Sequence, residues 1–409
     1  MNSVRQLYQA EQALSQIFSG IDTQVKENLR RVLSAFHAHK VGVHHFASVT
    51  GYGHDDLGRQ VFDQVFAAVM GAEAAAVRVQ FVSGTHAIAA ALFGVLRPGD
   101  EMLSVTGAPY DTLEEVIGLR GQGQGSLRDF GIGYKQLDLT PAGLIDWSQL
   151  AQAVSDRTRL VLIQRSCGYT WRPSLAIADI EKIITLVKQQ NPDTICFVDN
   201  CYGEFIETME PTSVGADLMA GSLIKNPGGT IVTAGGYIAG RADLVEAATC
   251  RLTAPGIGSS GGATFEQNRL LFQGLFLAPQ MVGEAMKGNH LAAHVFQNLG
   301  YPVNPPPEAL RRDVIQAIQL GSPDKLIAFC RAIQQHSPIG SYLDPIPASM
   351  PGYESQLVMA GGTFIDGSTS EFSADGPLRE PYIAFCQGGT HWTHVAIALE
   401  AAIEAVGPA

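Results

Sequence analysis

Apolar residues recur along the chain at two different spacings, which predict helices and strands in alternation. Residues 1–40 carry apolar side chains at near-helical spacing, and so do residues 62–70, with Phe62, Val65 and Val69 among the residues on one face. We predict strands over 77–82, 101–105, 134–139, 160–164, 195–199 and 230–238, and helices over 87–96, 147–154 and 180–187. Strands that alternate with helices favour a mostly parallel sheet covered by helices on both faces.

The second half of the chain predicts a smaller α/β unit. Residues 264–299 read as mostly helical with an interruption at Pro279, and the turn residues at 304–307 suggest a domain boundary. Beyond it we predict strands over 313–320, 357–364 and 382–387, and helices over 323–335 and from residue 391. We therefore expect a helical segment over 1–45 that packs on the small domain, a large domain over 46–290 and a small α/β C-terminal domain over 291–409.

Composition narrows the classes of function. The 409 residues are long enough for two domains, and the low charged fraction of 16% suggests that part of the surface is buried between subunits. The net charge of −12 argues against a nucleic acid partner, because phosphates need a basic patch. No apolar run of transmembrane length and no signal peptide are present, so we expect a cytoplasmic protein without a membrane partner. The six scattered cysteines suggest reduced thiols.

Two alternative kinds of site find little support. The histidines of residues 37–45 have no nearby carboxylate or cysteine, and Cys196 and Cys201 lack a second pair, so we predict no metal site. The glycine-rich turns match neither the phosphate-binding loop of nucleoside triphosphatases nor the dinucleotide fingerprint.

The segment 198–229 carries the strongest chemical signal. Asp199 stands at the end of a predicted strand, and Lys225 lies among apolar and small residues before the turn Asn226–Gly229. Desolvation lowers the pKa of a lysine and makes its amine a usable nucleophile, as in a Schiff-base lysine. An acid at a strand end is a suitable partner for a pyridinium nitrogen.

An anion site is predicted at the end of the strand over 77–82. Ser83-Gly84-Thr85 follows this strand and opens a helix, whose first N–H groups can bind a phosphate. Tyr110 and Arg165 also follow predicted strands, as Asp199 does. Ligands of parallel sheets sit at this edge, the carboxyl ends of the strands.

These motifs resemble those of a known enzyme class. The pattern Asp-Asn-x-Tyr from Asp199, Gly-Ala-Asp-Leu from Gly215 and Ser-x-x-Lys from Ser222 resembles the fold-type-I enzymes that use pyridoxal 5'-phosphate, most of all the cystathionine and methionine gamma-lyase branch. The stretches 51–56, 83–86, 97–100 and 222–229 look like the subgroup known as methionine gamma-lyase-like or aluminium-resistance carbon-sulfur lyases. The resemblance covers nearly the whole chain. It implies a fold-type-I aminotransferase-like fold and a homo-oligomer, dimer or tetramer, whose active sites are shared between subunits.

The resemblance also implies roles for individual residues around the cofactor. Lys225 would hold pyridoxal phosphate as an imine and then act as general base, while Asp199 would keep the ring nitrogen protonated. Tyr110 would stack on the ring. The residues expected to hold the phosphate are Ser83, Gly84, Thr85 and Ser222, with Tyr52 from the neighbouring subunit.

Arginine positions depart from the family pattern or match it loosely. Related lyases carry an arginine two positions after the tyrosine that Tyr52 matches, and here that residue is His54, with Arg59 as the nearest candidate replacement. Arg379 is the expected ligand of the substrate carboxylate, and Arg172 is a second candidate.

The implied function is a carbon-sulfur lyase that acts on a sulfur-containing amino acid, of the cystathionine beta-lyase or methionine gamma-lyase type. Two alternatives stay open: an aminotransferase of the same fold, and a protein that binds pyridoxal phosphate without catalysis. The intact pair Asp199 and Lys225 argues against the latter, because a binding protein does not need a reactive amine. The sequence leaves open the exact substrate and the choice between β and γ cleavage.

Overall fold

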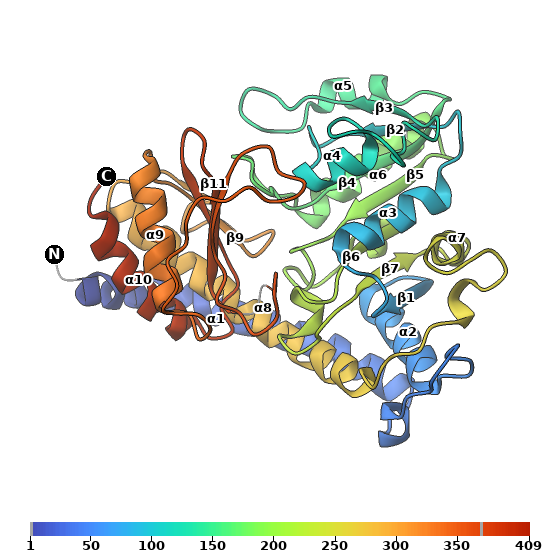
Figure 1. The fold of residues 1–409 in the computed structure, drawn as a ribbon, viewed down its shortest axis with the longest axis horizontal. Helices are drawn as coiled ribbons and strands as arrows, with labels where there is room; N and C mark the ends of the chain where they lie inside the picture. Colours follow the sequence, from blue (N-terminus) through green and yellow to red (C-terminus); the bar gives the residue numbers. More distant parts are fainter. Residues whose placement is uncertain (1–2, 369–370) are drawn as a thin grey trace.

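The larger sheet organises the fold of this computed structural model, which describes residues 3–368 and 371–409 (Figure 1). Its strand order is β1-β7-β6-β5-β4-β2-β3, and β7 runs antiparallel to both of its neighbours while the other pairs are parallel. The strands are β1 (Ala74–Arg78), β2 (Glu101–Ser104), β3 (Gly133–Gln136), β4 (Thr158–Gln164), β5 (Ile195–Asp199), β6 (Leu218–Ser222) and β7 (Gly236–Gly240). The predicted mostly parallel sheet is confirmed.

Helices cover both faces of this sheet, because successive side chains of each strand point to opposite sides. Phe197 packs in the core formed with α3, α4 and α7, whereas Cys196 and Val198 pack in the core formed with α2, α5 and α6. These helices are α2 (Leu57–Met70), α3 (Gly84–Val95), α4 (Asp111–Ile117), α5 (Trp147–Ala153), α6 (Ile177–Gln190) and α7 (Ala242–Leu252). Short 3-10 turns are η1 (Val43–Phe46), η2 (Pro211–Val214), η3 (Asn226–Gly228) and η4 (Gly258–Ser260).

A second, antiparallel sheet forms the small domain, with the strand order β10-β11-β12-β9-β8. Its elements are β8 (Val303–Asn304), β9 (Ile315–Gln319), α9 (Pro323–Gln335), β10 (Leu357–Ala360), β11 (Ser373–Pro377), β12 (Ile383–Gln387) and α10 (Trp392–Val406). One face packs on α9 and α10, and the other turns Ile315 and Phe385 toward Tyr169 and Tyr202 of the large domain. The small sheet therefore presents one face to the large domain.

Two long helices, α1 (Ser3–Ala38) and α8 (Asn268–Asn298), run beneath both domains (Figure 1). In α1, Leu7 lies in the small-domain core and Val32 in the large-domain core, so the segment does not pack on the small domain alone. The expected interruption at Pro279 is wrong. Here α8 continues through the proline, because burial on η3 and α1 outweighs the lost hydrogen bond. No helix in the described ranges is long and apolar enough to cross a bilayer.

Some strand predictions were misplaced, each for a local reason. The strand expected over 230–238 begins only at Gly236, because Thr230 has a φ of 76° and belongs to a turn. The strand expected over 77–82 ends at Arg78, where the Phe81 N–H donates to the Arg78 carbonyl in a turn. Strand β11 was not predicted, since Ser-Ala-Asp-Gly-Pro has no alternating apolar residues.

Candidate active site

A cavity of about 450 Å³ lies between the two domains, at the carboxyl ends of the central strands. Its lining brings together most of the residues singled out from the sequence. These are Ser83, Gly84, Thr85, Tyr110, Asp199, Ser222, Lys225 and Arg379. Tyr52 and Arg172 do not line it.

The N-terminus of α3 forms an anion-binding corner of this cavity. The Ser83 hydroxyl accepts a hydrogen bond from the His86 N–H at 3.1 Å and so caps the helix. Within the described part of the chain, the N–H groups of Gly84 and Thr85 have no partner. A Cβ on residue 84 would lie 3.1 Å from the Ser222 Cβ, so the corner requires a small residue there. Free N–H groups at a helix start fit a phosphate.

Asp199 ends strand β5 and is buried at the base of the cavity. Its Oδ1 accepts the Cys201 N–H at 3.1 Å, which fixes the orientation of the carboxyl group. Burial raises the pKa of Asp199, while the Cys201 N–H, Lys225 and Arg172 oppose the rise. A buried acid held in this way is suited to a cationic ring N–H.

Lys225 follows strand β6 and reaches the same space as Asp199. Its Nζ lies 3.7 Å from the centre of the Tyr202 ring, within cation–π range. Burial lowers the pKa of Lys225, but the neighbouring Tyr202, Cys201 and Asp199 raise it by more, so the net shift is upward. The lowered pKa expected from the sequence is therefore wrong for the protein alone, because Tyr202 and Cys201, which the sequence did not place beside Lys225, act on it together with Asp199.

The turn after Lys225 has a steric reason for its glycines. Gly229 has a φ of 52°, and a Cβ there would lie 2.1 Å from the Gly274 carbonyl oxygen of α8. Close packing of this turn on α8 therefore holds the backbone of Lys225 in place.

Tyr110 follows strand β2 and stands beside the anion-binding corner. Its hydroxyl lies 2.8 Å from the Thr85 Oγ1, and its backbone N–H donates to the Gln164 Oε1 at 2.9 Å. Burial raises the pKa of Tyr110, as do Asp199 and Cys201, so the phenol keeps its proton. The hydroxyl and the backbone N–H of Tyr110 are thus both held by hydrogen bonds. This fixes the orientation of an aromatic side chain that would lie against a flat ring.

Arg172 and Arg379 have different surroundings. The Arg172 guanidinium is buried and donates to the carbonyls of Gln164, Ser166 and Pro173. It cannot grip a substrate while it holds these carbonyls, so its prediction as a substrate ligand is not supported. Arg379 is exposed at the cavity mouth, and its side chain makes no hydrogen bond within the described residues.

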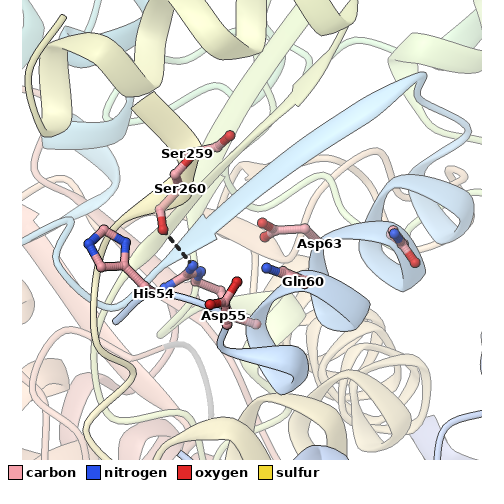
Figure 2. A pocket seen from close by; sticks show the side chains of 8 residues that line it. His54, Asp55, Gln60, Asp63, Ser259 and Ser260 are labelled. Carbon is pink, nitrogen blue, oxygen red and sulfur yellow. Dashed lines mark hydrogen bonds between the residues drawn. The ribbon is translucent and has the colours of Figure 1, made fainter. Parts of the chain in front are cut away.

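The guanidinium groups of Arg59 and Arg165 are also bound within the protein. Arg59 is 1% exposed and donates to the carbonyls of Gly53, Ser260 and Gly262. Figure 2 shows the bond to Ser260 at a second, polar pocket of about 370 Å³ beside His54. Arg59 therefore does not replace the family arginine, because its guanidinium anchors the loop around residues 260–262. Arg165 is equally buried and binds Asn200, Gly203 and Glu207.

Tyr52 does not line the cavity of its own subunit. Its side chain is 84% exposed, and its ring lies 5.6 Å from the ring of His54. The expected contact with a neighbouring subunit stays a prediction.

Sequence reasoning assigned no role to several residues of the cavity wall. Tyr202 was part of the Asp-Asn-x-Tyr pattern, and its spacing from Asp199 was the available signal. Asp375 and Gln387 come from the small sheet, and nothing local predicted that they face the cavity. The part of the chain that is described holds no cluster of histidine, cysteine or carboxylate groups suited to a metal ion.

Comparisons with known proteins agree with this geometry. A sequence model of the family described as Methionine gamma-lyase matches residues 3–407. The uncharacterized protein YnbB of Bacillus subtilis is 50% identical over 393 residues, which span 95% of this chain and 93% of that protein. An L-methionine gamma-lyase of Pseudomonas deceptionensis is 26% identical over 203 residues, 48% of this chain and 44% of that protein.

Solved structures also resemble this chain. A structure named a carbon-sulfur lyase involved in aluminum resistance, from Clostridium novyi, is 46% identical with a TM-score of 0.94, covering 98% of this chain and 95% of that one. A cystathionine gamma synthase from Xanthomonas oryzae is 17% identical with a TM-score of 0.60, covering 86% of each chain. The latter likeness shows the shared fold and confirms the predicted fold class.

Proposed function

The chain belongs to the methionine gamma-lyase family, and on that premise we propose that it is a pyridoxal-phosphate-dependent carbon-sulfur lyase acting on a sulfur-containing amino acid. One observation carries the proposal above the others. Lys225, Asp199 and the free N–H groups at the start of α3 surround a single cavity. An amine, a buried acid and an anion corner are what this cofactor needs from a protein.

The residues fit pyridoxal phosphate group by group. Lys225 would bind its aldehyde carbon, Asp199 would pair with its ring nitrogen, and Tyr110 would lie against the ring. The N–H groups of Gly84 and Thr85 would hold the phosphate. When bound, the cofactor supplies an electron sink that stabilises negative charge on the α-carbon of an amino acid.

The other steps belong to side chains of the chain itself. Arg379, free of other hydrogen bonds in the described structure, would bind the substrate carboxylate through its two-pronged guanidinium. Lys225 would accept the α-proton once substrate has taken its place, since its amine lies within the cavity. The walls from both domains would keep bulk water from the reacting atoms.

An aminotransferase would use most of the same groups, so the products decide between the two reactions. Purified protein is incubated with cystathionine, methionine, cysteine and homocysteine without added keto acid, and ammonia, 2-oxo acid and thiol are measured. We expect ammonia and 2-oxo acid in equal amounts over many turnovers, with the thiol distinguishing β from γ cleavage. A single turnover that stalls would show transamination, and no turnover with any of them would exclude the lyase proposal.

We further propose that a second copy of the chain covers one apolar surface. Tyr52, Val82, Ile257 and Phe265 are exposed, and loop contacts bring their segments together: the Gly262 N–H donates to the Tyr52 carbonyl at 2.9 Å, and the Gln80 side-chain amide donates to the Ala263 carbonyl. Val82 directly precedes Ser83 of the anion corner. A partner seated on this surface would place its own Tyr52 close to the phosphate, as the resemblance implies. A homo-oligomer with shared sites would follow.

A further inference from the structure

Asp375 is a carboxyl group of the cavity that the proposed function has not yet used. It lies in the middle of β11, where Ala374 points into the small-domain core and Asp375 points to the opposite face. That face lines the cavity, together with Phe385 and Gln387 of the neighbouring strand β12. Asp375 is only 7% exposed, so it meets the cavity from within a wall.

The contacts of Asp375 are neutral. The Gln387 side-chain amide donates to its Oδ2 at 3.4 Å, and the Tyr169 hydroxyl is a second hydrogen-bond partner. The described residues place no ion-pair partner within bonding distance of it. Lys225 is the nearby cation and lies across the cavity on the large domain.

The protonation state of Asp375 supports a role in proton transfer. Burial raises the pKa of Asp375 to about 7, against the opposing effects of the Tyr169 hydrogen bond and of Lys225. The titratable groups that face it in the cavity include Tyr169, Tyr202, Lys225 and Tyr353, and Cys330 and Cys386 lie on the other side of the sheet in the small-domain core. The thiols and phenols among them have raised pKa values and stay neutral, so Lys225 is the charged group that acts on Asp375.

We propose that Asp375 is the acid that protonates the sulfur of the leaving group, an assignment that rests on the proposed lyase function. After the α-proton has gone to Lys225, the carbon–sulfur bond breaks and its electron pair leaves with the sulfur. For a sulfur on the β-carbon, the electron pair left on the α-carbon becomes the new carbon–carbon double bond of the fragment that stays behind. The proton of Asp375 joins the sulfur, so that a neutral thiol departs, and the carboxylate regains a proton from solvent.

The chemistry of the leaving group explains why an acid is needed. The cysteine thiol has an ordinary pKa of about 8.5, and a simple alkyl thiol is a weaker acid, so an unassisted thiolate is a moderately poor leaving group at neutral pH. General acids work best when their pKa lies near the operating pH, and they contribute about 10²–10⁴-fold. Lys225 serves the α-proton from the large-domain wall, and Asp375 reaches the cavity from the small-domain wall.

A purely structural role is the competing explanation, in which Asp375 only ties β11 to Tyr169. The two explanations differ in their dependence on the leaving group. Chloride needs no proton to depart, so elimination from β-chloroalanine should not need the acid. Elimination of an alkyl thiol, in contrast, should need the acid.

The test is Asp375→Asn, assayed with β-chloroalanine and with the thiol-releasing amino acid that the wild type prefers. We expect kcat to fall about 10²-fold or more for the thiol substrate and by less than about threefold for β-chloroalanine. For the wild type, kcat/KM for the thiol substrate should fall as pH rises above about 7, and the variant should lack this decline. An equal loss for both substrates overturns the assignment.

Two further variants separate chemistry from folding. Tyr169→Phe removes the hydrogen bond to Asp375 but keeps the Asp375 carboxyl group. This variant should therefore show the same difference between the two substrates as the wild type. Asp344→Asn makes the same chemical change on the small-domain surface and should leave kcat unchanged for both substrates. Thermal unfolding of each variant shows whether stability has changed. A wild type that releases 2-oxo acid from neither substrate would instead overturn the proposed function, and the role of Asp375 with it.

Discussion

The Nζ atom of Lys225 lies 3.7 Å from the centre of the Tyr202 ring, so the amine and the phenol share one wall of the cavity. The ring attracts the ammonium form through its face, and the phenol hydroxyl adds a hydrogen bond. Together with Asp199, Tyr202 therefore helps to keep Lys225 protonated until a reaction partner arrives.

Removing only the hydroxyl of Tyr202 should make the Lys225 amine more reactive as a nucleophile. Tyr202→Phe keeps the ring but loses the hydrogen bond, so the pKa of Lys225 should fall and more neutral amine should exist at neutral pH. The rate at which the apoprotein captures pyridoxal phosphate should rise, by up to about tenfold for each pKa unit lost. Stopped-flow absorbance as a function of pH measures this rate. A slower capture at every pH would contradict this account of Tyr202.

The anion corner should tolerate no added methyl group. In Gly84→Ala the new Cβ would press on Ser222 and Cys201, with the closest contact at 3.1 Å, and would narrow the space for a phosphate. We expect the Kd for pyridoxal phosphate to rise about tenfold or more, as a loss of about 1.4 kcal/mol implies. Fluorescence titration measures it.

Gly20→Ala is the matched control for this change. Gly20 lies within α1, and a Cβ there would meet nothing within 4 Å. The control should leave the Kd unchanged and stabilise the fold by about 0.5–1 kcal/mol, since alanine favours helix. A Kd that rises in both variants would exclude the steric explanation.

Replacing Arg379 and replacing Arg172, the two arginines proposed from the sequence as substrate ligands, should have different effects. Arg379→Ala should raise KM for the substrate with little change in the unfolding temperature, because the side chain is exposed and unpaired in the described structure. Arg172→Ala should destabilise the protein by about 1–3 kcal/mol, because it leaves buried carbonyls without donors. Steady-state kinetics and urea unfolding distinguish them. A changed KM only in a well-folded Arg172 variant would reverse the assignment.

Stability should depend on pH through Glu204, which is fully buried. Its Oε1 accepts the Tyr237 hydroxyl at 2.7 Å, and burial raises the pKa of Glu204 to about 8. Between its unfolded pKa of 4.5 and about 8, the unfolded chain loses this proton while the folded chain keeps it. The free energy of unfolding should therefore fall as pH rises through this window.

Glu204→Gln should remove this contribution. Relative to the wild type, the variant should gain on the order of a few kcal/mol between about pH 5 and about pH 8. Urea unfolding at several pH values measures the difference. The exposed Glu27→Gln serves as control and should show no such trend. Parallel curves for the wild type and Glu204→Gln would show that Glu204 is ionised in the folded state.

Shared active sites predict rescue between two inactive variants. If Tyr52 serves the partner's cavity, equal amounts of Tyr52→Ala and Lys225→Ala subunits should regain about a quarter of wild-type activity when mixed under reversible dissociation. Half of the dimers would then be hybrids with one intact site each. Each variant alone stays inactive or weak. Absence of rescue, with hybrids shown to form by native mass spectrometry, would contradict the shared site.

The sequence predicted the order of the elements in the large domain and the position of Asp199 at a strand end well, because both depend on local patterns. Apolar alternation and strand-end polar residues are visible within short windows, as at Asp199. What it could not predict depends on contacts between distant segments. The acidic neighbours that raise the pKa of Lys225, the carbonyls that hold Arg172 and Arg59, and the direction of Asp375 each follow from packing rather than from spacing.

The most direct test of the account is to identify the residue that holds the cofactor. The protein, saturated with pyridoxal phosphate, is reduced with borohydride, digested and analysed by peptide mass spectrometry, with Lys225→Ala treated in parallel. The account predicts one modified peptide, labelled at Lys225, and loss of both the label and the visible absorption in the variant. A stable label on another lysine, or a variant that stays coloured, would contradict the central place of Lys225.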